Sequence, residues 1–370
     1  MRFGHKKMGI ARWKRTRRGT NLSGGRGGLY RSMVEAALAE WKTEGEADEE
    51  MDFGSDDEAL RAKYSQFRRF WMALWSNVFG SFDGITHIPA MRYTDDPSPP
   101  RHACCCHTLQ FFSAKIAEIR GGLQFPLDVF GIIAVRDSIE PRRNIVFSRP
   151  RNNCQTLTQQ DPYLELIGPT RAIVVNDPAT IEVMLKVKGS AESDDRILCI
   201  QAEQLRVSPT IQCQRLLERA FISKRSTVFF TLGQIRSSVE ATIFVRVMGG
   251  SWRCGFHGQF GARVTRDPRG RAPDTSIDYE KVTLLVCEDL VEQSRVTDSG
   301  DILLSRRVLS AVAGGKLIVF VRAWQDDGNI VRNEAVFTPK KAGRSTSDKL
   351  EFGFCTMEVT VAWSLISFRE

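Results

Sequence analysis

The stretch TIEVMLKVKG, residues 180–189, decides the fold class of this chain. Apolar residues take every second position: Ile181, Val183, Leu185 and Val187. The positions between them are largely polar: Glu182, Met184, Lys186 and Lys188. A period of two places one set of side chains on each face of an extended chain, which indicates a half-buried strand in an antiparallel sheet.

The same alternation recurs in VEATIFVRV (239–247) and MEVTVAWSL (357–365). Other strand-like runs lie at 109–119, 125–136, 143–149, 170–175, 196–202, 227–232, 281–287, 302–311 and 315–324. Joins rich in turn residues, such as NDP and QDDGN, separate them. Many short strands with few helical segments predict a mainly β fold, namely a large antiparallel β-sandwich or barrel-like domain over residues 109–370.

A different period precedes the strands. In residues 59–82 the large apolar residues recur at intervals of three and four: Tyr64, Phe67, Trp71, Leu74, Trp75 and Val78. This spacing predicts an amphipathic helix with an aromatic face, which we expect to dock on the following domain or on a partner. The proline-rich stretch DDPSPP (95–100) ends any helix, so residues 59–108 form a helix and a linker.

The first 58 residues segregate charge. They hold eleven basic residues, mostly near the start, and eleven acidic residues, mostly near the end, with Gly-rich SGGRGG in the basic part. Such a segment cannot bury enough apolar surface to order itself, so residues 1–58 are expected to be mostly disordered, with one short helix over 29–42. The net charge of +8 therefore belongs to residues 59–370.

The basic arm RWKRTRR (12–18) has three interpretations: a nuclear-import or RNA-contacting arm, an organelle transit peptide, or a solvated tail. No apolar run approaches the roughly 20 residues of a membrane-spanning helix, and the N-terminus lacks the apolar stretch of a secretory signal. We expect a soluble cytoplasmic or nuclear protein without a membrane span.

Four stretches carry a family resemblance: residues 68–94, 109–175, 180–189 and 353–366, the last reading GFCTMEVTVAWSLI. They closely resemble the grass-expanded plant family called domain of unknown function 6598. The resemblance implies a β-rich fold with no assigned activity. In some members the domain follows a ribosome-inactivating N-glycosidase domain in jasmonate- or stress-induced proteins.

The resemblance raises the question of N-glycosidase activity. Such enzymes carry a Glu-Ala-Ala-Arg stretch on a helix, in which the Glu and the Arg stabilise the transition state. Here VEAAL offers Glu35 but places Leu38 where the arginine should be. Because the segment before the β domain is also too short for that catalytic domain, no catalytic residue is carried over.

The sequence contains residues of the types that bind zinc and calcium. Cys104, Cys105 and Cys106 are consecutive, so their side chains are expected to diverge, although His102 with Cys106, or Cys104 with His107, would make half a zinc site. Aspartates in turns resemble the calcium ligands of sandwich modules: Asp177, Asp194, Asp195, Asp274, Asp278, Asp326 and Asp327. Turn chemistry explains the aspartates equally well, so we expect no metal and no other cofactor.

Catalytic signatures are sparse. The chain has no Gly-x-Ser-x-Gly elbow and no phosphate-binding loop of the Gly-x-x-x-x-Gly-Lys-Ser/Thr type. His257 is the only histidine after His107, and it is more simply a hydrogen-bonded structural residue than an acid or base. The nine cysteines show no repeated spacing, and Cys199 and Cys287 lie in apolar strand-like runs where a thiol is expected to be buried.

The sequence therefore favours a non-enzymatic interaction or binding module in plant stress or defence, with an unknown protein as its partner and nucleic acid as a second possibility through the basic arm. Two alternatives remain open. One is an enzyme or translation-directed factor related to ribosome-inactivating proteins, and the other is a carbohydrate- or lipid-binding β-sandwich. An enzyme needs polar residues that converge in one cleft, so a cleft near His257 would discriminate.

Overall fold

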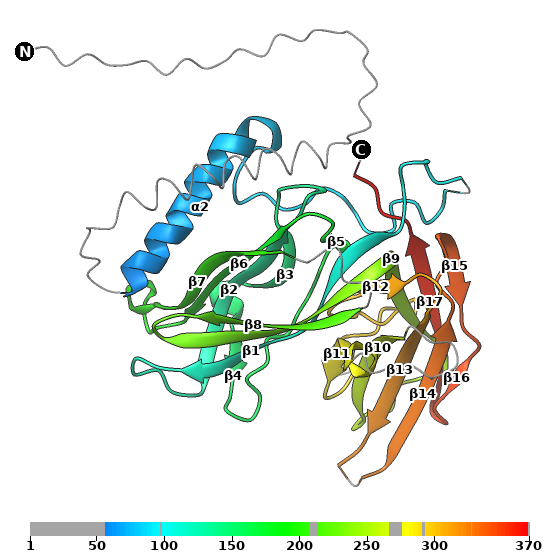
Figure 1. Ribbon diagram of the computed structural model, residues 1–370. Helices are drawn as coiled ribbons and strands as arrows, with labels where there is room; N and C mark the ends of the chain where they lie inside the picture. The colour runs from blue at the N-terminus through cyan, green and yellow to red at the C-terminus, as the bar shows by residue number, and fades with distance from the viewer. Residues whose placement is uncertain are drawn as a thin grey trace, which may run out of the picture.

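The computed structural model describes residues 56–96, 98–206, 214–265, 276–290, 293–326 and 328–368. In this part of the chain one long helix precedes three antiparallel sheets (Figure 1). The fold is therefore mainly β, as the alternation predicts. The expectations for residues 1–55, including the short helix over 29–42, the basic arm and the Glu35 motif, fall outside the described residues.

The largest sheet has eight strands. Its main path is β15 (Ala342–Thr346), β17 (Cys355–Ser364), β9 (Ser226–Gly250), β1 (Cys106–Ile119) and β5 (Ile173–Val174). Three further strands pair with members of this path: β8 (Arg215–Ile222) and β12 (Val308–Val312) with β9, and β16 (Leu350–Glu351) with β17.

Two smaller sheets complete the fold. One has the order β11 (Val282–Cys287), β10 (His257–Thr265), β13 (Lys316–Trp324) and β14 (Ile330–Phe337). The other has the order β3 (Asn144–Arg149), β2 (Leu127–Arg136), β6 (Ala179–Val187) and β7 (Arg196–Leu205), with β4 (Gln155–Leu157) beside β2. Short 3₁₀ turns lie at Arg151–Asn153, Glu192–Asp194 and Ser276–Tyr279.

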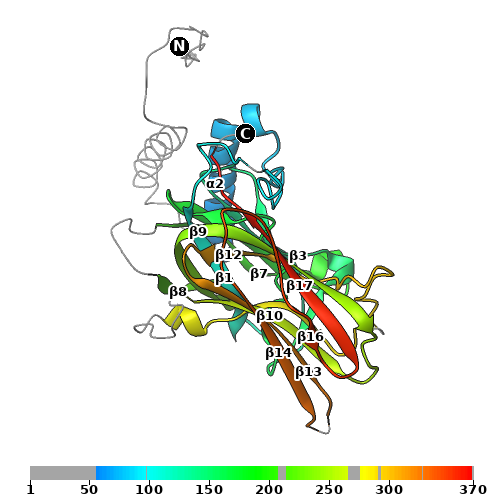
Figure 2. The same ribbon diagram turned by 90° about the vertical axis from the view of Figure 1, so that its right-hand side faces the viewer.

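Strand β9 is 25 residues long and contributes to two hydrophobic cores. Its first part, with Phe230, packs in a core shared with β2, β6 and β7, whereas its second part, with Ile243, packs in a core shared with β10, β11 and β13. Between the two parts Ser237 has a φ of 48°, and the pairing with β1 shifts register there. Such a bulge bends the strand, so β9 passes from a first sandwich, built around the core with Phe230, into a second sandwich, built around the core with Ile243 (Figure 2).

The strand predictions succeed where apolar residues alternate along the chain. Ile181, Val183 and Leu185 are all buried, and so are their counterparts on β17. The runs predicted at 227–232 and 239–247 are one continuous strand. The sequence pattern did not predict strands β10 and β14. Strand β10 contains His257 and two glycines, which interrupt the apolar alternation. Strand β14 lies at a sheet edge, where six of its eight residues are not buried.

Helix α2 (Asp56–Phe79) covers strand β7, and most of its aromatic face packs against the sheet (Figure 1). Tyr64 and Trp71, two turns apart, are buried, and Phe82 folds back beneath them after the helix ends before Gly80. The expected docking on the β region is thus confirmed. Val78, predicted on the same face, is 73% exposed, because the last turn of the helix extends past the sheet.

The segment that follows α2 is bound to both sandwiches. The backbone of residue 85 pairs in parallel with that of Arg143, the residue before β3. The buried Glu240 of β9 accepts hydrogen bonds of 2.7 Å from the backbone amides of Met91 and Ala172. Arg171 and Asp137, both buried, form a bidentate ion pair with bonds of 2.7 and 2.9 Å. The segment is therefore anchored to the β sheets through its buried residues Phe82, Thr86, Tyr93 and Thr94, while exposed residues lie between them.

Candidate functional site between helix α2 and strand β7

A groove of about 440 Å³ lies between helix α2 and strand β7. The helix side is largely aromatic and is formed by Phe67, Phe70, Trp71 and Trp75, with Leu60 near its start. The strand side is formed by residues 200–204 of β7 and by Ile222 at the end of β8. A concave, mainly apolar site of this size is typical of small-molecule binding sites.

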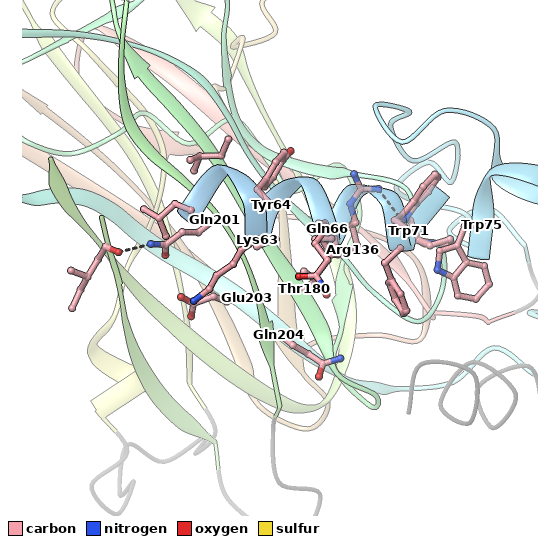
Figure 3. Close-up of a pocket in the computed structure, with 17 residues that line it drawn as sticks. Lys63, Tyr64, Gln66, Trp71, Trp75, Arg136, Thr180, Gln201, Glu203 and Gln204 are labelled. Carbon is pink, nitrogen blue, oxygen red and sulfur yellow. Dashed lines mark hydrogen bonds between the residues drawn. The ribbon is translucent and has the colours of Figure 1, made fainter. Parts of the chain in front are cut away.

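Polar groups lie at defined places along the groove (Figure 3). Lys63 and Glu203 lie toward one end, and Trp75 lies toward the other. Gln201 is buried and donates a hydrogen bond from its amide nitrogen to the carbonyl oxygen of Ile222. A carbonyl oxygen can only accept a hydrogen bond, so the side-chain nitrogen of Gln201, and not its oxygen, faces Ile222.

Glu203 is the acidic group of the groove. Burial raises the pKa of its carboxyl above the ordinary value, and the charge of Arg219 opposes the shift. The residue is exposed overall, so the effect of burial on its charge is small. Together with Lys63 it gives the groove one group of each charge at its rim.

An ionic cluster lies beneath the helix, with Glu182 of β6 at its centre. This carboxylate is fully buried and accepts hydrogen bonds from Arg136, Arg143 and Tyr64. The Arg136 Nε–Oε2 distance is 2.9 Å and the Arg143 Nε–Oε1 distance is 3.1 Å. Arg143 also pairs at 2.8 Å with the half-exposed Asp83. The cluster therefore neutralises two buried guanidinium groups.

The remaining donors of the cluster hold the chain around the helix. Arg136 donates to the carbonyl oxygens of Pro141 and Phe82 at 2.9 and 2.8 Å, and Trp71 donates to Pro141 at 2.8 Å. The guanidinium of Arg136 also stacks 4.1 Å from the centre of the Phe82 ring. These contacts fix helix α2 relative to β6, so the groove is formed before any ligand arrives.

The cluster positions the helix, and the pKa shifts of its groups keep their charge states fixed. Burial by itself raises the pKa of Glu182, but hydrogen bonds from Arg143 and the charges of Arg136 and Arg143 outweigh it and hold that pKa below 4.5. Burial, followed by the charge of Glu182, raises the pKa of the Tyr64 hydroxyl. The carboxylate stays ionised, the phenol stays protonated, and Glu182 has no exposed surface for a substrate to contact.

The cysteine triplet has a different geometry from the one expected. Cys104 and Cys106 do not diverge: their Sγ atoms lie 3.8 Å apart, because alternate residues of an extended chain point to the same side. Cys106 begins strand β1 and is buried, while Cys104 is exposed. The imidazole of His107 accepts a hydrogen bond of 3.3 Å at Nδ1 from the backbone amide of Ser237. Cys199 and Cys287 are buried free thiols, as predicted.

Three of the turn aspartates have partners that the structure defines. Asp195 pairs with Arg151 at 3.0 Å, and Asp194 accepts from the backbone of residue 191. Asp326 lies against His257, whereas Asp274 and Asp327 fall outside the described residues. Across the described ranges, no group of three or more His, Cys, Asp or Glu side chains is arranged to hold a metal ion.

His257 lies on β10 at the surface, where its Nε2 is 3.0 Å from a carboxylate oxygen of Asp326. Its ring stacks on Trp324, with the two centroids 5.3 Å apart. The two cavities that the structure defines most clearly are lined by other residues. The histidine is thus the first residue of an inner strand and is hydrogen-bonded to Asp326.

Sequence reasoning identified only half of the groove. The helical spacing indicated Tyr64, Phe67, Trp71 and Trp75, but the strand side lies in a run that was predicted only as residues 196–202. Glu182 was assigned to a polar, solvent-facing side. A signal was present, because the acidic residue on β6 is balanced by Arg136 on the adjacent strand β2 and by Arg143 just before β3. Their pairing, however, depends on the strand order.

Comparisons with known proteins identify the family of this chain. A family model described as "Domain of unknown function (DUF6598)" matches residues 108–361, more than half of the chain. No curated protein sequence matches the chain. No helix in the described part of the chain is long and apolar enough to cross a membrane.

Two solved structures are similar at low level: human GIVD cytosolic phospholipase A2, and the same protein in complex with methyl gamma-linolenyl fluorophosphonate inhibitor and terbium chloride. The sequence identity is 10% in both cases, and the TM-scores are 0.22 and 0.23. Each match covers 71% of this chain and 33% of the other, so the chain spans about a third of the length of those structures. Scores of this size carry no argument about function.

Proposed function

We propose that this chain, which belongs to the DUF6598 family of domains of unknown function, is a non-enzymatic binding module that takes a small ligand with an apolar body in the groove between α2 and β7. The observation that carries the proposal is the pre-formed aromatic groove above the buried Glu182 cluster. Binding to a pre-formed site avoids the cost of ordering the protein, so a small contact area suffices.

The size of the groove supports a small ligand over the protein partner expected from the sequence. Its volume of about 440 Å³ lies within the range of roughly 300–1,000 Å³ that is usual for small-molecule sites. Aromatic walls with glutamine and lysine groups at the rim suit a ring that carries polar substituents. This chemistry is closest to the carbohydrate- or lipid-binding alternative, which shares the same groove.

The enzymatic alternative has less support. Catalysis needs acid, base or nucleophilic groups that converge on one accessible point. The ionisable residues that converge here are Glu182, Arg136 and Arg143, and they lie beneath the helix with their hydrogen bonds already made. A setting in plant stress or defence, and any link to ribosome-inactivating proteins, rests on the family resemblance alone.

Binding of the apolar fluorophore 8-anilinonaphthalene-1-sulfonate tests the proposal. We expect saturable fluorescence enhancement with the full chain. Ala202→Trp, which fills the groove from β7, should weaken this binding at least tenfold. A matched control is Val336→Trp on β14, which adds the same side chain at an exposed position on another sheet and should leave binding unchanged.

A second variant tests the groove without adding a bulky side chain that could disturb the packing of helix α2. Phe70→Ala removes one wall of the groove without touching the Glu182 cluster, and it should also weaken binding while the circular dichroism spectrum stays unchanged. Equal affinity for the fluorophore in the original chain, Ala202→Trp and Phe70→Ala would place binding elsewhere and overturn the proposal.

A further inference from the structure

Two free thiols at the start of strand β1 lie in contact. The Sγ atoms of Cys104 and Cys106 are 3.8 Å apart, and the thiol of Cys106 also lies 3.8 Å from the carbonyl oxygen of Cys104. Cys104 is exposed, whereas Cys106 is only 1% exposed. One thiol is therefore open to reagents from solvent, and its neighbour is sheltered.

The backbone on both sides of the pair is fixed. Cys104 exchanges two hydrogen bonds with Ile366, of 2.9 and 3.1 Å, and Cys106 pairs with Ser238 of β9. Cys105 points away from its neighbours: it packs against the core that contains Ile243, whereas Cys106 packs in a small cluster with Ile366. Of the three cysteines, only Cys104 and Cys106 meet.

We propose that Cys104 and Cys106 form a reversible intrachain disulfide when the protein meets a hydroperoxide. In the first step the Cys104 thiolate attacks a peroxide oxygen, the O–O bond breaks, and Cys104 becomes a sulfenic acid as hydroxide leaves. In the second step the sulfur of Cys106 attacks the Cys104 sulfur, the S–O bond breaks, and the second hydroxide takes up the proton of the Cys106 thiol. Two thiols and one hydrogen peroxide thus give one disulfide and two waters, and a dithiol reductant reverses the change.

The order of the steps follows from exposure. Burial, together with the adjacent thiols, raises the pKa of Cys106 above the usual range, so Cys106 remains a thiol and is protected from direct oxidation. Cys104 is the residue that a peroxide reaches. Contact between the two sulfurs gives the sulfenic acid an immediate partner, which prevents oxidation to the irreversible sulfinic acid.

Formation of the Cys104–Cys106 disulfide disturbs the packing around Cys106. A disulfide bond is about 2.05 Å long, so the sulfurs must approach from 3.8 Å. Cys106 then withdraws from its contacts with Ala172, Val174 and Ile366. The bridge closes a loop of only three residues and adds little entropic stabilisation, so oxidation should lower the Tm by a few degrees.

The test uses the full chain treated with hydrogen peroxide, alkylated, and digested with trypsin. The peptide of residues 102–115 should lose two hydrogens and keep one alkylatable thiol, and dithiothreitol should restore all three. Cys105→Ser is the matched control and should still lose two hydrogens. Cys104→Ser, a change at an exposed position that leaves folding intact, should abolish the loss, and Cys106→Ala should do the same.

Three results would overturn the proposal: a disulfide that survives in Cys104→Ser, a disulfide that disappears in Cys105→Ser, and conversion of Cys104 to a sulfinic acid without any bridge. The outcome is independent of ligand binding in the groove, because Cys104 and Cys106 do not line it.

Discussion

The hydroxyl of Tyr64 on helix α2 donates a hydrogen bond to the carboxylate of Glu182, which lies fully buried on strand β6. The two residues are 118 positions apart in the sequence. This bond connects the helix that forms one wall of the groove to the sheet that forms the other. Removal of the carboxylate charge should therefore affect both stability and the position of the helix.

Glu182→Gln should lower the free energy of unfolding by about 3–5 kcal/mol, because the charges of Arg136 and Arg143 would then be buried without their main counter-charge. Urea denaturation, followed by circular dichroism, measures the loss. Glu288→Gln, the same change at an exposed position, should alter stability by less than about 0.5 kcal/mol. Equal stability of the two variants would contradict a stabilising role for the cluster.

The pKa of Glu182 predicts the pH dependence of this difference. Its folded-state pKa lies below the ordinary value of 4.5, so the folded chain binds fewer protons at this site than the unfolded chain. The stabilisation is therefore complete above about pH 4.5 and is lost as the pH falls through the lowered pKa. The stability gap between the original chain and Glu182→Gln should narrow as the pH falls below about 4.5, as measured by urea denaturation. A gap that widens on acidification would show the opposite sign of the shift.

Arg306 offers the contrasting case of a buried cation without a carboxylate partner. Burial lowers its pKa to about 10, and its Nε has no hydrogen-bond partner in the described structure. Its Nη2 donates to the carbonyl oxygen of Phe111, which also accepts from Gln110, so that oxygen keeps a donor when the arginine is removed. Arg306→Met should leave the free energy of unfolding unchanged or raise it by about 1–4 kcal/mol.

The matched control for this change is Arg171→Met. Arg171 is equally buried but pairs with Asp137, so its removal leaves a buried carboxylate alone and should cost about 3–5 kcal/mol. Guanidinium chloride denaturation of both variants compares them directly. Similar losses in the two variants would mean that Arg306 has a stabilising partner of equal weight.

The sequence predicted what depends on neighbours along the chain. Alternation identified β6, β17 and the second half of β9, because one face of each packs on a core. The aromatic spacing identified helix α2 and its buried residues Tyr64 and Trp71. These signals are local, and local periodicity reports which face of an element is apolar.

What the sequence did not predict depends on pairing over long distances. Glu182 was expected to face solvent because an acidic residue normally does, yet α2 covers it and two arginines from β2 and the residue before β3 neutralise it. The contact between Cys104 and Cys106 required the extended backbone that β9 and Ile366 impose. The groove itself exists only because helix and strand are brought together, so no single stretch contains its pattern.

The continuity of strand β9 couples the stability of the two cores. Phe230 and Ile243 lie on one uninterrupted strand, on either side of the bend at Ser237. Loss of order in either core would free part of β9 and remove an inner wall from the other. We therefore expect both sandwiches to unfold in a single cooperative transition, because the shared backbone of β9 couples one core to the other.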